Sequence, residues 1–268
     1  MAGDRYLGYR GTDANTAFAK YFQPQMAPLP SHVVEALQHG PQAGPTLLAF
    51  HDAACLADQG DQQTENGYGV LANRSIGVAV LTDMPGVTVP MWSWWFGWHG
   101  SDSRRYKLWH PRAHLFAQWH DGDDAGRRGA ARYVGRTSLI NEYIGSTLHR
   151  AAIQFVPPST LGLPDDGDAL SVCARLGSSD VPLDVGWFVH QIRPTAEGAQ
   201  MRSRFWLGGP YVQIRKHFGV ASPVLRPIVS RAMDTSVTVA RDLMVHCAQE
   251  MNHLAGFLPQ LYAEFRHD

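Results

Sequence analysis

The stretch from Asp242 to Leu261 most constrains the fold, because its spacing predicts an amphipathic helix with an unusual interior face. The apolar positions of that face are Val239, Leu243, Leu254, Phe257 and Leu261. His246 and Glu250 occupy the two steps between them, and side chains four apart on a helix lie about 5–6 Å from each other. A buried polar pair needs partners. A metal ion would satisfy both groups, and so would the commoner arrangement, a hydrogen-bonded His–Glu pair in a polar cavity.

The chain before this helix is rich in short strand-like segments, and its order predicts an α+β fold. Residues 1–66 are expected to form an irregular entry segment with short helices, 67–210 an antiparallel sheet that includes a strand over Val87–Trp92, and 222–267 the C-terminal helix. Many strands followed by a helix with one apolar face indicate a curved sheet wrapped around that helix, with a cavity between them. We expect one catalytic domain over 1–268.

Alternation within two strand-like segments predicts which side chains share a face. Arg132–His149 is expected to be extended, which places Ser138, Ile140, Glu142 and Ile144 together on one face. Val185–Arg193 is a second strand. It places Trp187 and Val189 on one face, with Phe188 and His190 on the other.

Composition excludes several classes of partner. The chain has 23 basic and 24 acidic residues and a formal net charge of −1, which argues against nucleic acid. It has no apolar run of the ~18 residues that a membrane span requires. Its three cysteines, Cys55, Cys173 and Cys247, form no CxxC pair. Together with the lack of a recognisable signal peptide, this predicts a reduced, cytoplasmic setting.

A metal held by His246 and Glu250 would need one or two further ligands from the sheet. Glu142 is a candidate because it is a charge in the middle of an apolar strand, and His190 lies in the apolar segment GWFVHQI. His114 and His99 are further candidates. For each of these alone, a hydrogen-bonded and partly buried structural role is the commoner outcome.

Several motifs in a fixed order resemble the 2,4-diacetylphloroglucinol hydrolase family, which includes phloretin hydrolases. These are the opening YFQPQMAPLP, the segment RYKLWHPRAH, NEY at Asn141–Tyr143, FVH at Phe188–His190 and HxxxE at His246–Glu250. The resemblance covers most of the chain. It implies a helix-grip (START-like) fold, one Zn²⁺ per chain, a homodimer, and hydrolysis of the carbon–carbon bond between an acyl group and a phloroglucinol-type ring.

The resemblance also implies roles for particular residues. The zinc ligands would be His114, Glu142, His246 and Glu250. His190 falls beside the metal, as general acid–base, and Tyr106 would hydrogen-bond a substrate oxygen. The chain departs from the family pattern at Ala117 and Phe205, where hydrogen-bonding side chains would be expected, and this puts the substrate in doubt more than the metal. Trp95 and Trp187 are expected, with Phe205, to wall the pocket for a small acylated phenol.

Three other readings stay open on the sequence. A helix-grip protein can be a non-catalytic carrier of an apolar aromatic ligand, which would need no stoichiometric zinc. Two histidines and a carboxylate also suit a non-haem iron oxygenase, whose reaction would stop without dioxygen. A structural zinc is disfavoured because such sites prefer clustered cysteines.

Overall fold

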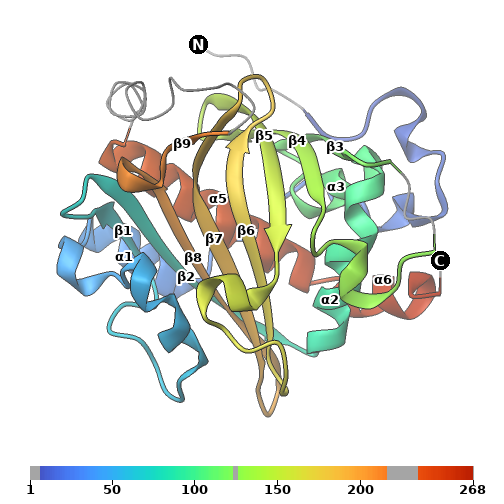
Figure 1. Ribbon diagram of the computed structural model, residues 1–268. Coiled ribbons are helices and arrows are strands. Elements are labelled where there is room, and N and C mark those ends of the chain that lie inside the picture. Colours follow the sequence, from blue (N-terminus) through green and yellow to red (C-terminus); the bar gives the residue numbers. More distant parts are fainter. Residues whose placement is uncertain (1–6, 123–125, 216–234, 268) are drawn as a thin grey trace.

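The computed structural model describes residues 7–122, 126–215 and 235–267 (Figure 1). Within these ranges one antiparallel sheet of nine strands forms the frame, in the order β1-β2-β8-β7-β6-β5-β4-β3, with β9 paired to β7. The strands are β1 (Gly67–Val70), β2 (Ser75–Pro85), β3 (His114–Trp119), β4 (Thr137–Ile144), β5 (Thr147–Val156), β6 (Leu170–Ser178), β7 (Leu183–Pro194), β8 (Gly198–Gly208) and β9 (Gln213–Ile214). The described part of the chain contains no helix long and apolar enough to cross a bilayer.

The helices pack around this sheet. They are α1 (Ser31–His39), α2 (Val89–Trp98), α3 (Ser103–Trp109), α5 (Val237–Ala255) and α6 (Leu258–Phe265). Single turns of 3-10 helix lie at Gly11–Ala14, Ala17–Tyr21, Gly44–Thr46, His99–Ser101, Gly129–Arg132, Pro158–Leu161 and Gly209–Tyr211, and a longer one at Phe50–Ala57. The described part of the chain before β1 thus contains α1 and four 3-10 segments and no strand.

Helix α5 crosses one face of the sheet, which we call the inner face (Figure 1). The Ser236 hydroxyl accepts a hydrogen bond from the Val239 amide and caps its N-terminus. The helix ends before Gly256, and α6 begins with Pro259 in its first turn, so the expected single C-terminal helix is broken into two. The expected start of the helix at residue 222 lies outside the described residues. A curved antiparallel sheet around a long C-terminal helix is the predicted helix-grip fold.

The strand expected over Val87–Trp92 is wrong, because these residues enter α2. Thr88 precedes the helix in an extended conformation, and Pro90 lies in its first turn, where a missing amide hydrogen costs little. The segment MWSWWFGW is apolar on all sides, so it carries no helical period in the sequence. It can be apolar all round because α2 is buried between the sheet and α6.

The strand expected over Arg132–His149 is two strands, β4 and β5, joined by a tight turn. Gly145 makes the turn with a φ of +58°, a conformation that glycine adopts without strain. The expected alternation holds within β4, because Ser138, Ile140, Glu142 and Ile144 all line one cavity on the inner face. It also holds in β7, where Phe188 and His190 face inward and Trp187 and Val189 pack on the outer face.

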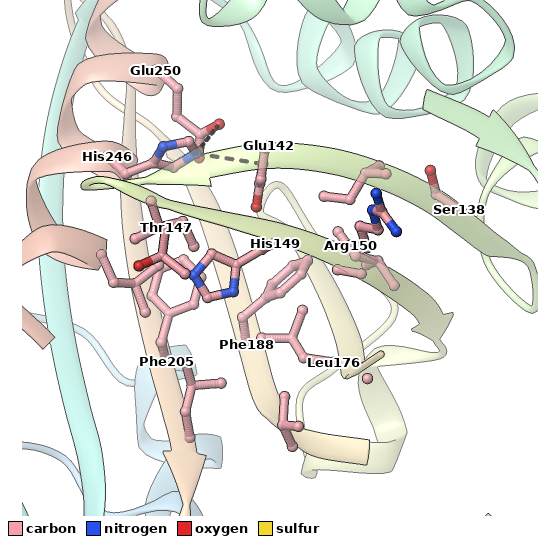
Figure 2. A pocket seen from close by; sticks show the side chains of 18 of the residues that line it. Ser138, Glu142, Thr147, His149, Arg150, Leu176, Phe188, Phe205, His246 and Glu250 are labelled. Atoms are coloured by element: carbon pink, nitrogen blue, oxygen red, sulfur yellow. Dashed lines mark ion pairs between the residues drawn. The ribbon is translucent and has the colours of Figure 1, made fainter. Parts of the chain in front are cut away.

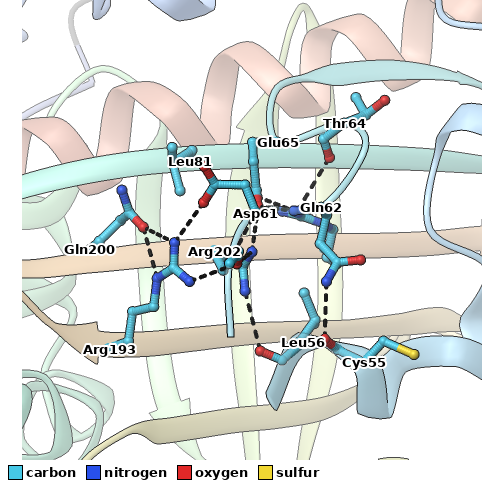
Figure 3. Close-up of polar contacts among 12 residues, drawn as sticks. Cys55, Leu56, Asp61, Gln62, Thr64, Glu65, Leu81, Arg193, Gln200 and Arg202 are labelled. Carbon is cyan, nitrogen blue, oxygen red and sulfur yellow. Dashed lines mark hydrogen bonds and ion pairs between the residues drawn. The ribbon is translucent and has the colours of Figure 1, made fainter. Parts of the chain in front are cut away.

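The outer face of the sheet is covered by the entry segment, and a buried charge cluster fastens it there (Figure 3). Arg202 and Arg204 of β8 are almost completely buried, and both donate to the Glu65 carboxylate. Arg202 also donates to the carbonyl oxygens of Leu56 and Gly60. Burial alone would raise the pKa of Glu65, but the two guanidinium groups outweigh it and hold the pKa below its usual value. These contacts tie the chain before β1 to the centre of the sheet.

Candidate metal centre and cavity

Four side chains from three remote segments meet on the inner face. His246 and Glu250 lie one turn apart on α5, and Glu142 on β4 stands opposite His114, the first residue of β3, in the strand register. Figure 2 shows Glu142, His246 and Glu250 pointing toward one another. The fold therefore brings together all four residues that the resemblance assigns to the metal.

The donor atoms of this cluster have the spacing of a metal site. Glu142 Oε2 lies 3.4 Å from His114 Nε2 and 3.5 Å from His246 Nε2. Glu250 Oε2 lies 3.4 Å and 3.7 Å from the same two nitrogens. Ligands about 2.1 Å from a tetrahedral zinc ion lie about 3.4 Å from one another. Donor atoms of His114, His246 and Glu250 all fall within 4.8 Å of each other.

His114 is held with one nitrogen directed at this centre. Its Nδ1–H donates to the Tyr106 carbonyl oxygen at 3.0 Å, and its ring stacks on the Tyr106 ring with centroids 3.7 Å apart. Its Nε2 is buried without a hydrogen-bond partner among the described residues. A backbone carbonyl on the far nitrogen is the usual support of a metal-bound histidine. The orphaned nitrogen and this support both fit a bound cation.

The electrostatics of the cluster favour charged ligands. Burial alone would lower the pKa of His114, but its contacts with Glu142 and Glu250 raise the pKa to about 9. Burial alone would raise the pKa of Glu142, but His246 and His114 hold it well below its usual range. The Glu142 carboxylate therefore stays ionised, and a cation can replace the proton on the His114 imidazole. The residues present fit zinc, which accepts nitrogen and oxygen ligands.

Tyr106 is attached directly to this cluster. It is buried in the middle of α3, and its hydroxyl donates a short hydrogen bond to Glu142 Oε2. Burial raises the pKa of Tyr106 far above its usual value, and the Glu142 and Glu250 carboxylates raise it further. The hydroxyl is therefore a stable hydrogen-bond donor beside the metal position.

A cavity of about 640 Å³ opens from the cluster along the inner face. Its polar lining includes Tyr106, Glu142, His190, His246 and Glu250. Its walls are mainly apolar and include Ile140, Ile144, Ile153, Leu176, Phe188, Phe205, Leu207 and Leu243 (Figure 2). This size and mixture of surfaces are typical of a pocket for a small organic molecule.

His190 lies in this cavity as a neutral imidazole. Burial lowers its pKa to about 3. Its Nδ1 lies 2.8 Å from Ser203 Oγ on β8, and its ring packs near Phe188 and Phe205. Because Nδ1 is engaged by Ser203, Nε2 is the ring nitrogen that remains available to a molecule in the cavity.

Three of the expected pocket residues are placed elsewhere. Trp95 is completely buried in the core, where it stacks on His99. Trp187 packs against Phe50 on the outer face of the sheet. Ala117 is buried on β3, and its amide bonds to the Ser103 hydroxyl. None of these three side chains lines the cavity. Of the pocket residues expected from the sequence, only Phe205 lines it.

The cavity also contains His149 and Arg150 of β5, which were not expected there from the sequence. His99, one of the candidate metal ligands, lines the cavity but is not part of the four-residue cluster. Ser203 was missed as the partner of His190. Period-two alternation in β8 could have found it, because Ser203 shares the inner face with Phe205.

Comparison with known proteins agrees with this geometry. Residues 47–263 match the family model described as the DAPG hydrolase PhiG domain. The chain is 32% identical to 2,4-diacetylphloroglucinol hydrolase of Pseudomonas protegens, over 97% of this chain and 88% of the relative. It is 28% identical to phloretin hydrolase of Eubacterium ramulus, over 96% of this chain and 93% of the relative. The chain belongs to the 2,4-diacetylphloroglucinol hydrolase family.

Proposed function

We propose that this chain is a zinc-dependent hydrolase that cleaves the carbon–carbon bond between an acyl group and a phloroglucinol-type ring. The observation that carries the proposal is the spacing of His114, His246 and Glu250, whose donor atoms lie within 4.8 Å of one another, with Glu142 Oε2 3.4 Å and 3.5 Å from the two imidazole nitrogens. Family membership supplies the class of reaction, since the named relatives act on diacetylphloroglucinol and on phloretin. The apolar walls suit a flat aromatic ring.

The chemistry requires the ring to be protonated before the bond breaks, because an aryl carbanion is a poor leaving group. In the proposed sequence His190 Nε2 accepts the proton of a ring hydroxyl and returns it to the ring carbon that carries the acyl group. The ring is then a β-diketone. Water adds to the acyl carbonyl, the carbon–carbon bond breaks, and its electron pair returns to the ring as a phenolate. The products are a carboxylic acid and the deacylated phenol.

The other polar groups of the cavity have supporting roles. Tyr106 donates a hydrogen bond, to Glu142 before substrate binds and to a substrate oxygen as charge develops there. Zinc, when bound, would supply Lewis acidity and make water more acidic. Glu142 and Glu250 reduce the net charge of that centre, which leaves proton transfer to His190. Phe205 offers no hydrogen bond, so it supports the ring by packing alone.

A metal assay run beside a substrate panel tests the proposal. The purified protein is analysed for metals and incubated with monoacetylphloroglucinol, diacetylphloroglucinol and phloretin, with and without a chelator. We expect one zinc per chain and release of the acid and phenol, lost with chelator and unchanged under argon. A metal-free protein that returns an intact ligand would be a carrier, and turnover that stops under argon would be an oxygenase.

A homodimer of single-domain chains working in the cytoplasm completes the proposal. It rests on the family resemblance and on the pattern of free cysteines. Light scattering on the purified protein measures the mass of the assembly, and a monomer would contradict this part of the proposal without touching the chemistry.

A further inference from the structure

His190, which lines the cavity, has a buried partner that the proposed reaction has not yet used, Ser203. The two residues are directly opposite each other in the register of β7 and β8, so their side chains project from the same face. Ser203 is completely buried, and its Oγ lies 2.8 Å from His190 Nδ1. The contact is set by two central strands, which makes its geometry rigid.

The Ser203 hydroxyl has a second neighbour on α5. It is hydrogen-bonded to the Cys247 thiol. A hydroxyl can donate one hydrogen bond and accept two. Ser203 can therefore accept from His190 Nδ1–H while its own hydrogen turns toward the Cys247 sulfur, which is a weak acceptor.

This arrangement matters when His190 holds a proton on both nitrogens. The imidazolium has an Nδ1–H that needs an acceptor, and the surrounding rings of Phe96, Phe188 and Phe205 provide none. Ser203 Oγ is the atom in reach. The same bond keeps the proton of the neutral ring on Nδ1 and the lone pair of Nε2 toward the cavity.

We propose that Ser203 is a positioning residue that orients His190 and keeps its Nε2 available to the substrate. This inference rests on the proposed function, in which His190 moves the proton from a ring hydroxyl to ring carbon. Ser203 itself touches no reacting atom. It acts by fixing the ring orientation and by accepting the hydrogen bond that the protonated ring must make.

The test compares Ser203→Ala with Ser203→Thr in the zinc-loaded protein. We expect kcat of Ser203→Ala to fall roughly tenfold to a hundredfold, within the range of acid–base effects, with KM and zinc content unchanged. Ser203→Thr keeps the hydroxyl and is expected to recover most of the rate. Ser171→Ala is the matched control, because Ser171 is also a buried strand serine but stands opposite Gln191, not His190, in the strand register.

A spectroscopic readout separates positioning from packing. Nitrogen-15 shifts of His190 should report the proton on Nδ1 in the unaltered protein and a mixture of tautomers in Ser203→Ala. If Ser203→Ala does not fold, Ser203→Cys takes its place, since a thiol is only a weak hydrogen-bond partner. Unchanged kcat and shifts in Ser203→Ala, or equal losses in Ala and Thr variants, would overturn the inference. The substrate panel tests the proposed function separately.

Discussion

His114 and Glu142 stand opposite each other in the register of β3 and β4, with Nε2 and Oε2 3.4 Å apart. Two neighbouring strands therefore present an imidazole and a carboxylate to the same point, and α5 supplies the second pair from across the cavity. The register is interrupted by an irregularity between His114 and Phe116. Such a bulge re-aims side chains at sheet edges near functional sites.

Removing the charge of Glu142 should release the metal. Glu142→Gln keeps the size of the side chain but removes the carboxylate charge that faces both His114 and His246, and we expect zinc affinity to fall by about a hundredfold or more. Zinc content after dialysis against a weak chelator measures the loss. Glu264→Gln is the control, because this carboxylate is exposed and pairs with Lys20 far from the site. A Glu142→Gln protein that kept its full zinc would remove Glu142 from the proposed ligand set.

Changing His190 should stop turnover without releasing zinc. His190→Ala removes the proposed proton carrier but no proposed metal ligand, so kcat is expected to fall about 10²- to 10⁴-fold with stoichiometric zinc. Steady-state rates and metal analysis on the same preparation give both quantities. His120→Ala, at an exposed histidine, should behave like the unaltered protein. Loss of the metal from His190→Ala would contradict the proton-carrier role.

Breaking the outer-face charge cluster should destabilise the fold and leave the chemistry intact. Glu65→Gln would leave the buried Arg202 and Arg204 without a counter-charge. Breaking a buried ion pair in this way costs about 3–5 kcal/mol of unfolding free energy. Urea unfolding of the zinc-loaded protein measures the change. Asp58→Asn alters an exposed carboxylate of the same segment and should change stability little. Equal unfolding midpoints for the two variants would show that the cluster does not hold the entry segment.

Acid should destabilise the fold through buried neutral histidines. Burial lowers the pKa of His99 to about 4, whereas an unfolded chain has a histidine pKa near 6.5. Because the unfolded state binds the proton first, His99 stabilises the fold fully above about pH 6.5, and this stability is lost as pH falls toward 4. The loss reaches about 3 kcal/mol for a shift of this size. Unfolding curves from pH 7.5 to 4.5 should be less pH-dependent in His99→Phe, and identical slopes would refute the assignment.

Much of the site could be predicted because it follows short-range periodicity. The four-residue step on α5 placed His246 beside Glu250, and alternation placed Glu142 and His190 on inward faces. The same alternation put Trp187 on the face opposite His190, so it could not share that cavity, and its aromatic character alone was misleading. Helix α2 was missed because a segment that is apolar all round has no period to read.

Local sequence patterns do not predict that the four candidate ligands come together in space. The distance between His114 and His246 depends on the β3–β4 register, on its irregularity and on where α5 crosses the sheet. None of these is set by residues close in the chain. The family resemblance supplied the ligand set, and the coordinates supply its spacing.

The metal position joins an edge strand, its neighbour and the last long helix, which are far apart along the chain. A cation bound there would stabilise the native state. Because it binds only the native arrangement, its binding free energy adds to the free energy of folding. Metal loading would then be coupled to the packing of the sheet on the helix. Protein made without that cation would be less stable and more open to proteolysis, even with every side chain of the site intact.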